Sequence, residues 1–197
     1  MIRIGHLYPY ELDLYGENGN IKALKYALDK KNIENEIIYI LPETEINFND
    51  YDFLYIGSGR KVELDRVKER LLPYKEKLLN YISRGGILLS TGNSISVFDF
   101  LELYEVEYEE KRKVSDVKAT ASLCNGVIYG FQNTEYLIKT TDNILFQMEK
   151  GYGNNNTGLE GFMKNNFYAT SMIGPILARN DNLNHYFIDI LTKENID

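Results

Sequence analysis

The regular alternation of strand-like and helix-like segments in the first hundred residues constrains the fold more than any other feature. The spacing of apolar and β-branched residues predicts strands over 1–7, 36–41, 52–56 and 87–89. Helical spacing predicts helices over 21–28, with Asn20 as cap, over 64–71, and over 73–82 after Pro73. The alternation therefore predicts a parallel sheet with right-handed crossovers and helices on both faces.

The second half of the chain has a different pattern. Strand-like segments joined by turns are predicted over 114–118, 122–129, 136–139, 144–148 and 166–172, with a final helix over 183–191. The charged run Glu105 to Lys113 is interpreted as a solvated edge or turn. We expect one domain over 1–197. Its predicted fold class is α/β, a doubly wound, mostly parallel, flavodoxin-like sheet followed by a β-rich C-terminal half.

Composition excludes several classes of function. One cysteine cannot form an internal disulfide framework, and with only two histidines a ligand-rich zinc site is not expected. The net charge of −7 argues against a nucleic-acid partner. No apolar run is long enough for a membrane span, and the N-terminus lacks the features of a signal peptide. We therefore expect a cytoplasmic protein with no metal and no cofactor.

Two turns follow strands at the edge of the sheet where ligands bind in such folds. The first, Gly57-Ser58-Gly59-Arg60, could bring backbone N–H groups to a ligand, or be a simple turn. The second runs from Leu89 to Ser94, between a buried strand and an apolar helix containing Ile95, Val97 and Phe98. Its shape is that of a nucleophile elbow, a strand-to-helix turn that projects one side chain, here Thr91.

At these turns the sequence resembles the CobB/CobQ-like class I glutamine amidotransferases, in particular the glutaminase subunits of lipid II isoglutaminyl synthase. The opening words HLYPYELDLYGENGNI are similar to the family's HLYPDLLNLYGDRGNI. In order, DYDFLYIGSGR, GILLSTGNSISVF, YGFQN and GYGNNNTGLEGF through GPILARN are similar to later family words. The resemblance covers essentially the whole chain.

The resemblance implies a class I glutamine amidotransferase-like fold and a chemistry that this chain has lost. Family members hydrolyse glutamine with an elbow Cys and a His base, and pass ammonia to a Mur-ligase-like partner. In this chain Thr91 stands at the Cys position and Ile173 at the His position. A vestigial oxyanion turn and pocket are expected at Gly57, Ser58, Gly59, Arg60, Gly92 and Asn93.

Other reactive residues have simpler interpretations. Ser90 and Ser94 flank Thr91 without an evident base, and Cys124 is expected to be a buried small hydrophobe. His6 is expected to support the scaffold, and His185 lies near the last helix. The loop 15–20 lacks the residues of a P-loop or dinucleotide fingerprint, so it is interpreted as a loop and helix cap. Tyr8, Tyr10 and Tyr15 could cover either a partner surface or the sheet edge.

The leading hypothesis is a noncatalytic homologue of the glutaminase subunit. It would bind or regulate a Mur-ligase-like partner in cell-wall precursor amidation, or hold a small amide or amino acid in the old pocket. The alternative is an active amidase or glutaminase with an unrecognised nucleophile. Ammonia release from glutamine distinguishes the two.

Overall fold

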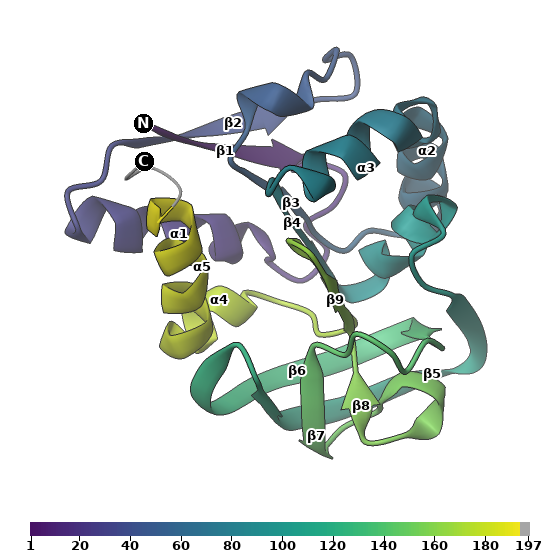
Figure 1. Cartoon of the computed structure of the whole chain (residues 1–197). Coiled ribbons are helices and arrows are strands. Elements are labelled where there is room, and N and C mark those ends of the chain that lie inside the picture. Colours follow the sequence, from purple (N-terminus) through teal and green to yellow (C-terminus); the bar gives the residue numbers. More distant parts are fainter. Residues whose placement is uncertain (194–197) are drawn as a thin grey trace.

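The main sheet runs through the middle of the structure, a computed structural model that describes residues 1–193 (Figure 1). Its strand order is β2-β1-β3-β4-β10-β9, and every neighbouring pair is parallel except β10 with β9. The strands are β1 (Ile2–Leu7), β2 (Asn35–Ile40), β3 (Phe53–Ile56), β4 (Ile87–Thr91), β9 (Phe162–Lys164) and β10 (Phe167–Thr170).

Alternate residues of β3 face opposite sides of this sheet. Phe53 and Tyr55 pack with α1 (Asn18–Lys30), α4 (Ile176–Arg179) and α5 (Asp181–Lys193). Leu54 and Ile56 pack with α2 (Lys61–Leu71), α3 (Lys75–Ser83) and the 3-10 helix η3 (Gly92–Leu101). This period of two puts helices on both faces, as the sequence predicts.

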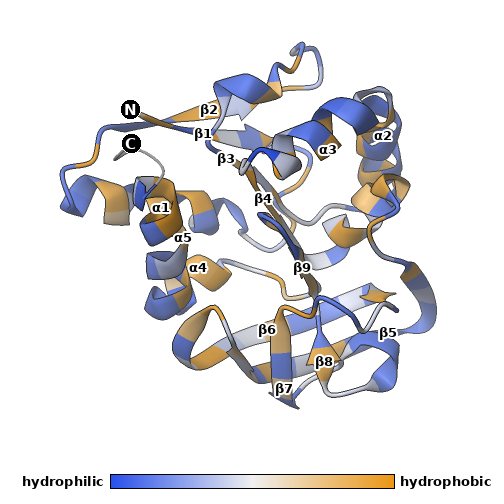
Figure 2. Cartoon of the chain, viewed as in Figure 1, coloured by the Kyte–Doolittle hydropathy of each residue, from blue (hydrophilic) through white to orange (hydrophobic). Residues whose placement is uncertain are grey.

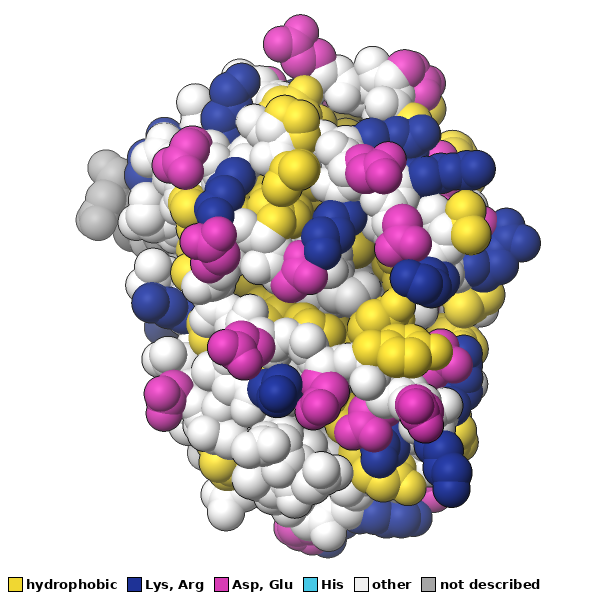
Figure 3. Space-filling view, turned by 90° about the vertical axis from the view of Figure 1, so that its right-hand side faces the viewer, with side chains coloured by type: hydrophobic (Ala, Val, Ile, Leu, Met, Phe, Trp, Pro, Cys, Tyr) yellow, Lys and Arg dark blue, Asp and Glu magenta, His cyan; other side chains and the backbone are white. Residues whose placement is uncertain are grey.

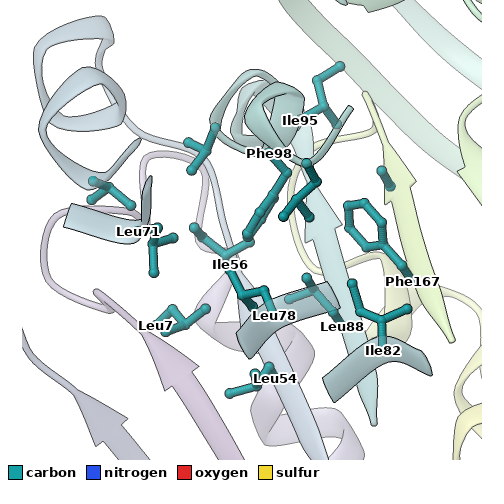
Figure 4. Close-up of a cluster of buried hydrophobic side chains, with 14 of the residues drawn as sticks. Leu7, Leu54, Ile56, Leu71, Leu78, Ile82, Leu88, Ile95, Phe98 and Phe167 are labelled. Carbon is teal, nitrogen blue, oxygen red and sulfur yellow. The ribbon is translucent and has the colours of Figure 1, made fainter. Parts of the chain in front are cut away.

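The second core, between the sheet and α2, α3 and η3, is closed by aromatic and branched side chains (Figure 4). Phe98 from η3 and Phe167 from β10 meet at an interplanar angle of 73°, with ring centroids 5.6 Å apart. Leu88 of β4 is fully buried in the same cluster. Apolar residues accordingly follow β4 through the centre of the molecule (Figure 2).

A second, antiparallel sheet follows in the chain, with the order β6-β5-β7-β8. It contains β5 (Val106–Ala121), β6 (Cys124–Ile138), β7 (Phe146–Lys150) and β8 (Leu159–Glu160). Single-turn 3-10 helices, η1 (Phe48–Asp50), η2 (Leu72–Tyr74) and η4 (Asn154–Asn156), complete the described elements. A bridge between Gln132 and Met172 joins β6 to the segment after β10, so the two sheets meet beside the end of β10.

The fold class is confirmed, with local differences. The helix after β4 is a 3-10 helix, and the charged run is an exposed part of β5, whose pairing with β6 shifts register between Tyr108 and Lys113. The two-residue strand β8 and the three-residue strand β9 carry too short a pattern for the sequence to reveal. Asn20 is not the cap of α1, because Glu17 occupies that position and Asn20 lies inside the first turn.

The surface carries no broad region of one charge on the face shown in Figure 3, where acidic and basic side chains alternate. Hydrophobic side chains gather between the upper and lower parts of that face. Across residues 1–193, no helix combines the length and the apolar character that crossing a membrane requires.

Asn20 joins three elements through its buried amide. Its Nδ2 donates to Tyr55 Oη at 2.7 Å and to the Gly174 carbonyl at 3.1 Å, and its Oδ1 accepts from Leu177 N at 2.8 Å. We predict that Asn20→Ala lowers the unfolding free energy by about 3 kcal/mol, because several buried polar groups lose their partner. Urea unfolding measures this. The exposed helical Asn80→Ala is the control and should change it by less than about 0.5 kcal/mol; equal effects would contradict the prediction.

Candidate functional site

The candidate site lies where β3, β4 and β10 reach their carboxyl ends. Ile56 pairs with Ser90 and Thr91 pairs with Thr170, so the turns after these strands are neighbours. This places the Gly57–Arg60 turn, the Thr91–Asn93 turn and Ile173 in one region, as parallel pairing requires. The structure therefore brings the expected site positions together.

Thr91 does not project from its turn, so that expectation is wrong. Its backbone is extended, with φ −124°, and its side chain is fully buried. Thr91 Oγ1 lies 2.8 Å from Tyr55 Oη, which also accepts a hydrogen bond from Asn20. Burial, with a smaller contribution from the Glu17 carboxylate, raises the pKa of Tyr55 far above its usual range. The Thr91 hydroxyl therefore belongs to a chain of neutral polar groups without a base.

The Gly57–Gly59 turn is closed by the side chain of Asn93. Asn93 Oδ1 accepts from Gly59 N at 3.1 Å, and Asn93 Nδ2 donates to the Gly59 carbonyl at 2.7 Å. A Cβ added to Gly59 would overlap Leu12, which packs over the turn. The Gly59 N–H is therefore engaged within the protein, whereas an oxyanion hole needs donors free to bind the substrate.

Arg60 turns away from this region. Its side chain is exposed and pairs with Glu63, and its backbone N–H donates to Glu63 Oε2 at 2.8 Å. This arrangement forms the start of α2. The neighbouring residues Gly57, Ser58 and Gly59 are buried. Among the described residues, the turn 57–60 therefore does not share a cleft with Ile173, contrary to the expectation from the sequence.

Glu17 is the functional candidate that sequence reasoning missed at this turn. Its carboxyl group is fully buried, with Oε2 accepting from Tyr15 N at 2.7 Å. Burial raises the pKa of Glu17, and the neighbouring Ser58 hydroxyl offsets part of that rise. Glu17 Oε1 and Ser58 Oγ are both buried, and neither bonds to any other group within residues 1–193. The sequence offered one signal for this residue, a carboxyl side chain in the loop 15–20, which belongs to the opening segment that is similar to the family.

A second buried carboxyl group supports the segment that leads to Ile173. Glu160 accepts hydrogen bonds from Thr170 Oγ1 at 2.9 Å, and from Ser171 N and Ser171 Oγ at 2.7 Å. Gln132 Nε2 donates to the same Ser171 hydroxyl at 2.8 Å. Burial raises the pKa of Glu160, and these donors oppose the rise. The network connects β6, β8 and β10 below Ile173.

Ile173 lies beside a cavity of about 490 Å³ that the sequence did not reveal. Aromatic, aliphatic and cationic side chains line it: Tyr15, Phe131, Ile173, Pro175, Ile176 and Arg179. Its volume falls in the range of ligand pockets. The residues of the Gly57–Arg60 turn do not line it.

The other reactive side chains form no nucleophile and base pair in the described residues. Ser90 and Ser94 are buried and bond to each other at 2.9 Å. Cys124 is half-buried at the start of β6, and burial raises the pKa of its thiol. His185 is exposed on α5. Nor does any group of three or more His, Cys, Asp and Glu side chains in this range have an arrangement that could hold a metal ion.

The structure places all three ambiguous tyrosines. Tyr10 is 76% exposed, and its ring centroid lies 6.3 Å from that of Tyr39 on β2, so it covers the sheet edge. Tyr15 lines the cavity beside Ile173. Tyr8 is buried.

Known proteins are similar to this chain in sequence. Lipid II isoglutaminyl synthase (glutamine-hydrolyzing) subunit GatD of Streptococcus pneumoniae is 27% identical over 211 residues, covering 98% of this chain and 81% of its own. The corresponding subunit of Staphylococcus aureus is 27% identical, covering 95% of this chain and 83% of its own. The chain is GatD-like, since it is similar to both of these subunits over nearly its whole length.

The GatD-like chain also shares its fold with solved amidotransferases. A glutamine amidotransferase from Thermotoga maritima superposes with a TM-score of 0.58 at 12% identity, covering all of this chain and 86% of its own. No family model matches the sequence.

His6 supports the site from β1 and is one of two histidines in the chain. It is buried against the ring of Tyr55, at a centroid distance of 5.2 Å, and its Nε2 has no partner among the described residues. Burial lowers the pKa of His6 from 6.5 to about 4. The unfolded chain therefore binds more protons than the folded chain between these pH values.

We predict that this difference lowers the unfolding free energy by about 3 kcal/mol as the pH falls from about 6.5 to about 4. His6→Phe removes the titrating group, so its unfolding free energy should fall less over the same range. Urea titrations at several pH values measure the difference. The exposed His185→Phe is the matched control and should keep the wild-type pH dependence; identical profiles for His6→Phe and the wild type would contradict the assignment.

Proposed function

We propose that this chain is a noncatalytic GatD-like subunit that binds or regulates a Mur-ligase-like protein in cell-wall precursor amidation. The observation that carries the proposal is the environment of Thr91. Its hydroxyl is buried against Tyr55, and an isoleucine occupies the expected base position. A hydroxyl becomes nucleophilic only beside a base that removes its proton, and no imidazole faces this one.

The closed turn supports the same conclusion. Acyl transfer depends on preorganised N–H donors that point to the developing oxyanion. The Gly59 N–H is bound by Asn93, and Leu12 covers the turn. Three separate requirements of glutamine hydrolysis (nucleophile, base and oxyanion donor) are thus unmet by the expected residues.

A partner role is consistent with the comparisons. Both relatives are described as subunits of lipid II isoglutaminyl synthase, and this chain spans most of their length. We propose the same kind of assembly here, with residues 1–197 as one amidotransferase-like domain. A cytoplasmic location remains a prediction.

A small ligand is the second candidate role, and the cavity beside Ile173 favours it. The 490 Å³ space is mostly apolar, and Arg179 is among the residues that line it. An amino acid or small amide would fit this combination of an apolar body and a charged or polar end.

Absence of glutamine turnover is the first prediction from this proposal. Loss of a catalytic nucleophile lowers turnover by about a million-fold, which leaves a rate below spontaneous hydrolysis in an ammonia assay. Purified wild-type protein and Thr91→Ala should therefore release no ammonia from glutamine above the buffer control. Turnover by the wild type that Thr91→Ala abolishes would contradict the proposal and favour the alternative of an active enzyme.

Complex formation is the second prediction. Co-expressed with a Mur-ligase-like protein of its own genome, the chain should copurify with it through size exclusion at micromolar concentration. The complex should amidate its acceptor when ammonium is added and should not do so with glutamine as the nitrogen source. Failure to copurify, or glutamine-dependent amidation, would overturn the partner role as stated. A complex assembled with an intact glutaminase subunit is the positive control.

A further inference from the structure

We propose that the nucleophile position of this chain is residue 92, and that Ser58 now occupies the space its side chain would need. The inference rests on the proposed function, since it concerns how the site of a noncatalytic homologue is closed. It moves the expected nucleophile position from Thr91 to Gly92. It also adds Ser58 to the residues in which this chain differs from an active enzyme.

The backbone at the turn supports this assignment. A nucleophile elbow is a sharp, strained turn, and its strain is stored in a residue with an unfavourable backbone conformation. Thr91 is extended, at φ −124° and ψ 148°, and continues β4. Gly92 follows with φ +65°, in the left-handed region. Residue 92 is therefore the position of this turn at which a residue with a side chain would be strained.

The direction of a side chain at each position agrees with the backbone. Thr91 points to Tyr55 inside the sheet layer. A Cβ built on Gly92 would instead lie 2.9 Å from Ile173 Cγ2, the side chain at the expected base position. It would also overlap Ser58 Oγ, in the turn after β3. Of the two positions, only residue 92 would therefore direct a side chain towards both Ser58 and Ile173.

Ser58 has no room to move away. Its side chain is fully buried, and its neighbours Gly57 and Gly59 are covered by Glu17 and Leu12, which a Cβ at either glycine would meet closely. Ser58 Oγ lies beside the buried Glu17 carboxyl group, whose pKa it lowers, and it bonds to no other group in residues 1–193. A hydroxyl at 58 and a side chain at 92 thus exclude each other.

A stability cycle tests this exclusion. Gly92→Ala alone should lower the Tm by on the order of 10 °C, because the added methyl group overlaps Ser58 and the residue is strained. Ser58→Ala removes the overlapping hydroxyl and should recover at least half of that loss in the double variant, since the Ser58 Cβ lies 3.3 Å from the added atom. Gly126→Ala is the matched control, because Gly126 also has a positive φ, +93°, but faces Asn182. Ser58→Ala should recover nothing there.

Every result of this cycle decides the proposal. No recovery at residue 92, or equal recovery at residue 126, overturns it. If Gly92→Ala fails to fold, folding of the double variant supports the proposal, and failure of both overturns it.

Thiol reactivity tests the direction of the side chain separately. Two variants are made, both of which also carry Cys124→Ser and Ile173→Ala. The first variant combines Gly92→Cys with Ser58→Gly, and the second carries Thr91→Cys. Iodoacetamide should alkylate the first at least ten-fold faster, because that thiol faces the cavity opened at residue 173; equal or reversed rates overturn the assignment. Equal or reversed alkylation rates would overturn the assignment of residue 92 but would not affect the prediction that the protein releases no ammonia from glutamine. Glutamine turnover by the wild type would overturn the proposed function but would not affect the result of the stability cycle.

Discussion

The pairing of β4 with β3 on one side and β10 on the other fixes the position of every residue at the candidate site. Because all three strands are parallel, the turns that follow them meet at one edge of the sheet. Helices packed on both faces and the bridge from β6 to Met172 hold that edge in place. The fold therefore brings the turns after β3, β4 and β10 together, whatever side chains these turns carry.

Within that frame, the polar groups of the site bond to one another. Tyr55 connects Thr91 to Asn20, and Asn93 binds both backbone groups of Gly59. Such buried networks stabilise a single arrangement when their members are satisfied. Groups that a catalytic site would keep free for a substrate here contribute to the packing of the domain core. The open space lies to one side, between Ile173 and Arg179.

Much of this architecture could be predicted from the sequence, because alternating strands and helices carry strong periodic signals. β1, β3 and β4 lie close to their expected ranges, and the class of fold follows from their order. The site was harder to predict, since side-chain direction at a turn depends on backbone angles that residue identity does not specify. Threonine before glycine suggested a projecting hydroxyl, whereas Thr91 extends the strand and turns inward. The sequence predicts Asn20 only as the cap of α1, whereas its amide bonds to α4, far along the chain, which sequence spacing does not reveal.

The overlap of Ser58 Oγ with a Cβ built on residue 92 means that, under the proposed function, no single substitution at these turns would supply an unobstructed nucleophile. A new side chain at 92 alone would collide, a smaller residue at 58 alone would leave a void without any gain in activity, and a base at 173 alone would have nothing to activate. Under the proposed function, activity would therefore need a side chain at residue 92, a smaller residue at 58 and a base at 173 at the same time.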